Sequence, residues 1–117
     1  MQSPLHSASY WEIFLWLLRH YRRVRVTGNS MLPLLSPESE VLLDPAAYTK
    51  SLPKAGDIVI AYHPHQPKLS IIKRVDFVEP NGLCYLKGDN PDASSDSRQF
   101  GLVSQVQLQG KVICRFP

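Results

Sequence analysis

This sequence of 117 residues has few cysteines and no long apolar run. Its two cysteines, Cys84 and Cys114, show no CxxC spacing and provide no disulfide framework. Because each lies inside an apolar, strand-like run, we expect both thiols to be buried, in a reducing compartment. The apolar stretch Trp11–Leu18 is well short of the about 20 residues that a spanning helix needs, so a transmembrane anchor is disfavoured.

A recognisable export signal is also lacking, because the basic cluster follows the apolar stretch instead of preceding it. Four arginines in "RHYRRVRV" (Arg19, Arg22, Arg23 and Arg25) hold much of the net charge of +3. Such a cluster can face acidic lipid, nucleic acid or water. Only Tyr21 is interleaved with this charge, which disfavours nucleic acid as a partner. We therefore expect a cytoplasmic protein, and peripheral contact with a membrane stays open.

Turn-forming residues, in contrast, are well represented, with ten prolines and six glycines spread along the chain. This distribution is typical of short strands joined by turns. The length suits one domain spanning residues 1–117. We expect a mainly β fold of short antiparallel strands with one N-terminal helix, placed in residues 1–21, followed by a β core in residues 22–117. The alternation of apolar residues and the turn signals predict strands at 22–26, 40–44, 57–62, 69–78, 82–88 and 106–116.

The expected N-terminal helix runs from about Tyr10 to His20, with Ser7 or Ser9 as its cap. Apolar residues nearly surround it. Such a helix must cover the domain, dock a partner or lie in a membrane interface, and the sequence leaves these three roles open.

The stretch "TGNSMLPLL" places a serine directly after a strand. Gly28 and Asn29 permit a turn there that would present Ser30 at the strand end. A serine hydroxyl is a poor nucleophile unless a base removes its proton. The candidate bases are the four histidines, the carboxylates and any lysine that is neutral near pH 7.

Lys73 is a candidate base because it has apolar neighbours. In the expected strand 69–78, period-two alternation places Ile71, Lys73, Val75 and Phe77 on one face. Removal of an ammonium group from water lowers its pKa toward the range where the amine acts as a general base. The alternative is a lysine whose stem packs on the sheet while its head reaches water, and the strand alone leaves both open.

A third segment, "GDNPDASSDSRQFG" at residues 88–101, is dense in turn formers and acidic residues. It lacks the central glycine and terminal glutamate of an EF-hand calcium loop. Together with "GNSMLP" and "IIKRV", in this order, it resembles the three conserved boxes of the type I signal peptidase family of serine proteases. The resemblance covers roughly residues 24–115, and the third box behind a Lys-Arg strand is its most specific part.

The resemblance implies a Ser/Lys dyad in which Ser30 is the nucleophile and Lys73 the general base. Ser94 matches the serine of the family that hydrogen-bonds the lysine amine. One departure is Gly28, since many bacterial members carry there a serine whose hydroxyl helps to bind the oxyanion. The backbone N–H of Ser30 would then carry more of that task.

The same resemblance implies three supporting residues in the last box and one beside the lysine. Asp89 matches the acid that pairs with the arginine after the catalytic lysine, here Arg74. Asp96 and Arg98 match residues that brace the loop beneath the site. No cofactor is implied, and His63 and His65, at a spacing that nickel or zinc can use, are more typical of a polar loop.

Two functions follow from the resemblance. The chain is similar in size to the small nickel-type superoxide dismutase maturation proteases, which implies removal of an N-terminal leader from such a precursor. The alternative is a membrane-peripheral signal peptidase that processes exported proteins. A self-cleaving repressor of the SOS type and a non-enzymatic nucleic-acid-binding module are less compatible, since the third box is of the peptidase kind. The expected partner is a precursor protein with an N-terminal leader.

Overall fold

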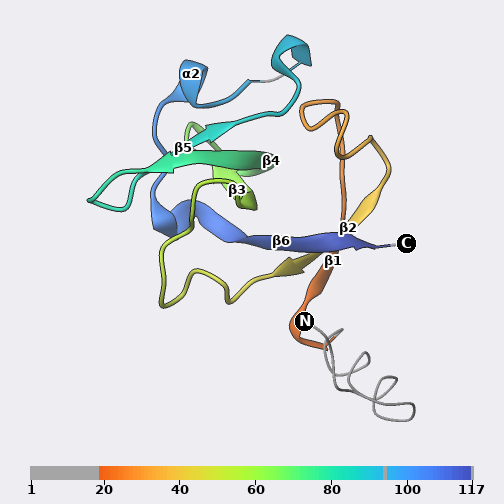
Figure 1. Ribbon diagram of the computed structural model, residues 1–117, viewed down its shortest axis with the longest axis horizontal. Coiled ribbons are helices and arrows are strands. Elements are labelled where there is room, and N and C mark those ends of the chain that lie inside the picture. Colours follow the sequence, from red (N-terminus) through yellow and green to blue (C-terminus); the bar gives the residue numbers. More distant parts are fainter. Residues whose placement is uncertain (1–18, 94, 117) are drawn as a thin grey trace.

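The computed structural model describes residues 19–93 and 95–116, and within them the strands form one antiparallel sheet. The sheet order is β1-β2-β6-β3-β4-β5, so β1 and β5 are its edges (Figure 1). The strands are β1 (Arg22–Arg25), β2 (Glu40–Asp44), β3 (Ile58–His63), β4 (Gln66–Val78), β5 (Cys84–Lys87) and β6 (Leu108–Phe116). The predicted mainly β class is confirmed.

The expected N-terminal helix lies outside the described residues except at its end, where Arg19 and His20 are helical. The described helices are short and were not predicted. They are the 3₁₀ turns η1 (Pro91–Ala93) and η2 (Gln105–Gln107) and the single turn α2 (Ser97–Phe100). No helix within residues 19–93 and 95–116 has the length and apolar character needed to cross a membrane.

Two apolar clusters form the core, and alternation along the central strands divides residues between them. Val59 in β3 belongs to one cluster and its neighbour Ile60 to the other. In β4, Val75 joins the cluster of Val59, whereas Ile72 joins the cluster of Ile60. This is the period of two that side chains follow along a strand. The second cluster also contains Val26, Met31 and Leu35, so the segment after β1 is anchored in the core.

Where the strands are irregular, the predicted burial is wrong. The pairing of β4 with β5 shifts register between Val75 and Phe77. Phe77 therefore leaves the face expected for it, is 42% exposed and stacks on Tyr85, with ring centroids 4.9 Å apart. Cys84 is buried as predicted, but Cys114 is exposed, because it follows another register shift in the pairing of β2 with β6.

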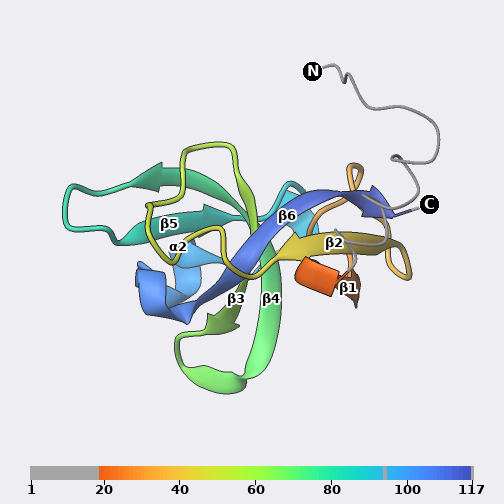
Figure 2. The same ribbon diagram turned by 90° about the horizontal axis from the view of Figure 1, so that it is seen from below.

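The turn between β3 and β4 is shorter than the gap between the predicted strands 57–62 and 69–78. β3 continues to His63 and β4 begins at Gln66, and the resulting hairpin projects from the sheet (Figure 2). His63 is buried, and its ring and that of Phe100 pack edge to face with their centroids 4.7 Å apart. The backbone N–H of His65 donates to Nδ1 of His63 at 3.0 Å, so this nitrogen is the acceptor of a turn contact.

Candidate active site

The loop that carries Ser30 is built directly on the end of β1. Val26 continues the strand by donating to the carbonyl of Ser39 at 2.8 Å and accepting from Glu38 at 2.9 Å. Gly28 then turns the chain with φ of +79°, a conformation that favours glycine. Met31, 1% exposed, packs into the core directly after the serine. The buried residues on both sides of the turn hold Ser30, itself half-buried, in a defined position.

Lys73 lies in the middle of β4, opposite Val59 of β3. It is only 4% exposed, so the reading in which its head group reaches water does not hold. Burial lowers the pKa of its amine from the ordinary value of 10.5, and the negative charge of Asp96 opposes this shift. The sequence had left open whether this amine is buried or reaches water, and the structure places it in the buried setting.

Ser30 and Lys73 line the same cavity, which has a volume of about 280 Å³. One wall is the edge strand β1 with the residues that follow it, and the other is the part of β4 from Leu69 to Lys73. The Ser30 hydroxyl lies 3.5 Å from the carbonyl oxygen of Ile72, the residue before the lysine. A contact of this length is weak and leaves the hydroxyl proton available to a better acceptor.

The first part of the third box is tied to β4 by an ion pair next to Lys73. The Arg74 guanidinium donates through Nε and Nη2 to the two carboxylate oxygens of Asp89, each at 2.9 Å. A third bond runs from Nη1 to the carbonyl of Gly56 at 3.0 Å. Paired N–H donors fix the orientation of a carboxylate as well as its position. The pair therefore fixes where residues 88–90 leave the sheet.

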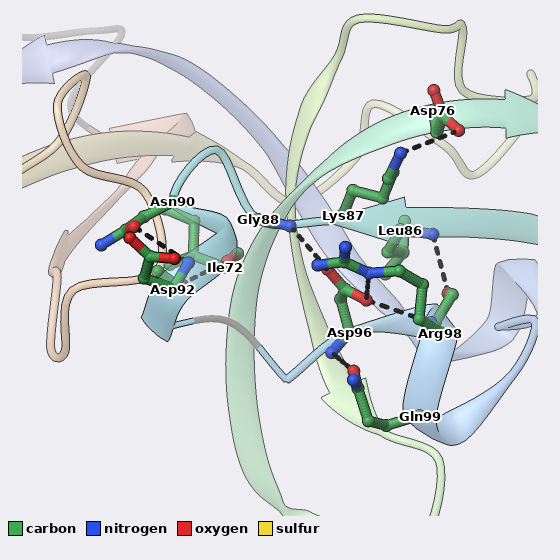
Figure 3. Close-up of polar contacts among 12 residues, drawn as sticks. Ile72, Asp76, Leu86, Lys87, Gly88, Asn90, Asp92, Asp96, Arg98 and Gln99 are labelled. Carbon is green, nitrogen blue, oxygen red and sulfur yellow. Dashed lines mark hydrogen bonds and ion pairs between the residues drawn. The ribbon is translucent and has the colours of Figure 1, made fainter.

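The second part of the box is organised by Asp96, which is fully buried. It caps α2 by accepting from the N–H of Arg98 at 3.0 Å, and it also accepts from the Arg98 side chain and from the N–H of Gly88 (Figure 3). The Gln99 side chain accepts from the N–H of Asp96 at 2.9 Å, which completes a capping box. One carboxylate thus joins both ends of the loop.

Asn90 is a contact residue that sequence reasoning missed. Its backbone N–H donates to the carbonyl of Ser30 at 2.8 Å, and its Nδ2 donates to the carbonyl of Asn29 at 3.0 Å. Its Oδ1 accepts from the N–H of Asp92 at 3.2 Å (Figure 3). The loop after β1 and the segment after β5 accordingly lie side by side in Figure 1. Position within the third box was the one signal for this role.

These contacts leave open two expected features of the site, the bond from Ser94 to the lysine amine and the donors that would bind the oxyanion. Ser94 lies outside the described residues, so its expected bond to the lysine amine stays a prediction. At Gly28, the space where a side chain would begin is open. The N–H of Ser30 donates to no acceptor within residues 19–93 and 95–116, which leaves it available to a bound oxygen.

No group of three or more His, Cys, Asp or Glu side chains in the described part of the chain is arranged to hold a metal ion. Ser30 and Lys73 bring a hydroxyl and a buried amine to one cavity, and the Ser30 backbone N–H has no acceptor in the described part of the chain. These are the parts that acyl transfer by a serine requires.

The sequence matches the family model described as signal peptidase, peptidase S26, over residues 10–79 and 76–116. Three curated relatives are informative. The Arabidopsis thaliana mitochondrial ATP-independent inner membrane protease subunit 1b is 33% identical over 110 residues, covering 75% of this chain and 65% of the relative. Subunit 2 of the mitochondrial inner membrane protease of Danio rerio is 34% identical over 108 residues, covering 74% and 59%. The human subunit 1 is 31% identical over 108 residues, covering 76% and 65%.

Proposed function

This chain belongs to the signal peptidase family, peptidase S26, and we propose that it is a serine endopeptidase in which Ser30 attacks the peptide carbonyl and Lys73 removes the serine proton. The observation that carries the proposal is the shared cavity, in which a half-buried hydroxyl faces the same space as a lysine that is 4% exposed. Burial lowers the pKa of that lysine, which supports its role as a general base.

The proposed reaction has two halves. Neutral Lys73 takes the hydroxyl proton as the Ser30 oxygen bonds to the carbonyl carbon, and the oxyanion accepts from the N–H of Ser30. The lysine ammonium then gives its proton to the departing amine as the peptide bond breaks, which leaves an ester on Ser30. In the second half, Lys73 takes a proton from water, the hydroxide oxygen replaces the serine oxygen, and Ser30 regains its proton. We propose that Ser94 hydrogen-bonds the amine throughout.

The supporting residues have proposed roles that follow from their contacts. The Arg74–Asp89 pair holds the third box against the strand of the lysine. Asp96 and Arg98 hold the far end of that box, and the Asp96 charge moderates the pKa of Lys73. The cavity between an edge strand and β4 suits a substrate peptide in an extended conformation. The family resemblance favours small side chains just before the cleaved bond.

The proposed substrate is the N-terminal targeting segment of a precursor protein. The relatives are named as inner membrane protease subunits, and this favours the membrane-peripheral, signal-peptidase-like reading over the nickel superoxide dismutase precursor. Because the chain spans 65% of the Arabidopsis relative and 59% of the Danio rerio relative, their activities are a guide for this proposal only. The basic cluster formed by Arg19 and the arginines of β1 supports binding to an anionic membrane surface.

The experiment is to incubate the purified protein with two precursors, one carrying a signal-type leader and one the leader of a nickel-type superoxide dismutase. Mass spectrometry then locates each new N-terminus. We expect cleavage of the signal-type leader after a small residue and no cleavage by Ser30→Ala. Preferential cleavage of the dismutase precursor would reverse the assignment of substrate, and cleavage by Ser30→Ala would contradict the assignment of the nucleophile.

A further inference from the structure

Asn90 holds both peptide groups that flank Ser30. Its Nδ2 bonds to the carbonyl of Asn29 at 3.0 Å, and its backbone N–H bonds to the carbonyl of Ser30 at 2.8 Å. The Asn29 carbonyl also accepts from Leu32 within its own turn, at 3.2 Å. The Asn90 bonds differ because they come from a separate segment of the chain. The orientation of these two peptide planes therefore depends on the third box.

The Asn29 carbonyl belongs to the same peptide group as the N–H of Ser30. This peptide is trans, so the carbonyl and the N–H point in opposite directions. A bond that fixes the carbonyl on the Asn90 side directs the N–H to the opposite side. A hydrogen bond to the carbonyl oxygen also polarises the amide, which makes the N–H a better donor.

This N–H matters more here than in a site with a second donor nearby. Position 28 is glycine and provides no hydroxyl, and the Ser30 N–H has no acceptor in the described part of the chain. We propose that Asn90 is a positioning residue for the oxyanion hole, which holds the Asn29–Ser30 peptide so that its N–H meets the developing oxyanion. This inference rests on the proposed serine peptidase function.

The variant that isolates this role is Asn90→Asp. It keeps the backbone N–H to Ser30 and an oxygen to accept from Asp92, but it replaces the Nδ2 donor with an oxygen facing the Asn29 carbonyl. Asn90→Ala removes the donor without adding charge. Loss of an oxyanion donor lowers kcat about 10²- to 10³-fold, and misorientation of that donor should lower it about 10- to 100-fold.

Gln105→Glu is the matched control. Gln105 is also an amide that donates through its side chain to backbone carbonyls of another loop, those of Tyr48 and Ser51. It does not line the cavity of Ser30 and Lys73. The change from amide to carboxylate should lower the melting temperature of the protein to a similar extent as Asn90→Asp does. In Gln105→Glu, kcat should stay within about 2-fold of the parental value.

The test measures kcat, KM and inhibition by a peptide boronic acid, whose tetrahedral serine adduct places an oxygen in the oxyanion hole. In both Asn90 variants we expect a lower kcat, a KM within about 2-fold of parental, and boronate affinity that falls in proportion to kcat. A parental kcat, a change in KM alone, or unchanged boronate affinity would overturn the inference. So would loss of folding in both variants, since Asn90 would then act on the fold as a whole. An inactive parental protein would instead reject the proposed function itself.

Discussion

At the scale of single residues, Lys73 combines a proposed chemical role with an unfavourable location. Its amine is buried in the sheet, and removal of a charge from water destabilises the folded state. The lowered pKa means that the unfolded chain holds the proton more tightly. The free energy of unfolding should therefore rise with pH from the folded-state pKa up to about 10.5.

Replacement of this lysine separates activity from stability. Lys73→Met keeps the length of the side chain and suits the apolar surroundings. We expect cleavage to fall by more than about 10³-fold, with a melting temperature at neutral pH equal to or above the parental value. Lys73→Arg should be equally inactive, since a guanidinium does not give up its proton near neutral pH. Thermal unfolding and precursor cleavage measure the two effects, and an active, less stable Lys73→Met would contradict both.

The pH dependence of cleavage follows from the same group. Because the proposed base must be neutral, kcat should increase as pH rises through the Lys73 pKa, which burial lowers from 10.5. Single-turnover rates between pH 6 and 10 test this. A rate that is flat from pH 6 upward, with chemistry limiting, is incompatible with a lysine base.

The apolar neighbours of Lys73 could be predicted from the sequence and the contacts of Asn90 could not, for a physical reason. The setting of Lys73 is local, since alternation with Ile71 and Val75 places it in an apolar environment. The partners of Asn90 are distant, since Asn29 lies 61 positions before it in the sequence, and only the closed fold brings them together. Ser30 became a candidate through its turn residues and the family resemblance, but its cavity depends on β4 as well.

At the scale of elements, the third box is attached to the rest of the fold at two points. The Arg74–Asp89 pair holds its beginning to β4, and Asp96 holds its end through the cap of α2. Strand positions were predictable because apolar alternation is a local signal. The capping box was not assigned, although Asp96 and Gln99 stand at its typical spacing, because a single helical turn gives no periodic pattern.

Substitution of Asp96 can separate the effect of its negative charge from its role as the N-cap of α2. Asparagine caps a helix about as well as aspartate, so Asp96→Asn should keep α2 in place. Loss of the negative charge removes the contribution that raises the Lys73 pKa. We therefore expect the rising limb of the pH profile to move to lower pH in Asp96→Asn. An unchanged profile, or a shift to higher pH, would contradict the electrostatic coupling.

Asp96→Ala serves as the companion variant, because it removes the cap and the charge together. Loss of an N-cap costs about 0.5 to 2 kcal/mol, and here the Arg98 guanidinium also loses its partner. We expect a lower melting temperature than in Asp96→Asn, measured by calorimetry. Equal melting temperatures would show that the cap contributes nothing to the fold.

At the scale of the whole molecule, the arrangement of charge matters more than its total. Glu40 forms ion pairs with Arg23 and Arg25, and Glu38 pairs with Arg25 as well. Half of the basic cluster is thus partly neutralised on the protein itself. Arg19 and Arg22 are exposed and form no ion pair with another described residue, so they are the arginines best able to meet a membrane.

Vesicle binding tests this proposal. Each basic residue near an anionic surface contributes about 1 kcal/mol, so Arg19→Glu with Arg22→Glu should weaken binding to phosphatidylserine vesicles by at least about 10-fold. The same change at Lys50 and Lys54, outside the cluster, gives an equal net charge and should weaken binding less. Equal losses in the two double variants would show that net charge alone acts. Sedimentation with vesicles provides the measurement.

The sheet order shows what the sequence cannot provide at this scale. The strands were predicted in chain order, but β6 inserts between β2 and β3, which joins the first half of the chain to the second. This long-range pairing sets the walls of the cavity, because it fixes how far β1 lies from β4. No local pattern in β6 specifies its two neighbours.

The proposed function rests on Ser30 as a nucleophile that neutral Lys73 activates. The most direct measurement uses a serine-directed acylating probe, with the modified residue located by peptide mass spectrometry in the parental protein and in Lys73→Met. We expect one adduct, on Ser30, that forms faster as pH rises in the parental protein and is nearly absent in Lys73→Met. An adduct on a different residue would contradict Ser30 as the nucleophile. Labelling of Ser30 at the parental rate in Lys73→Met would contradict its activation by the lysine.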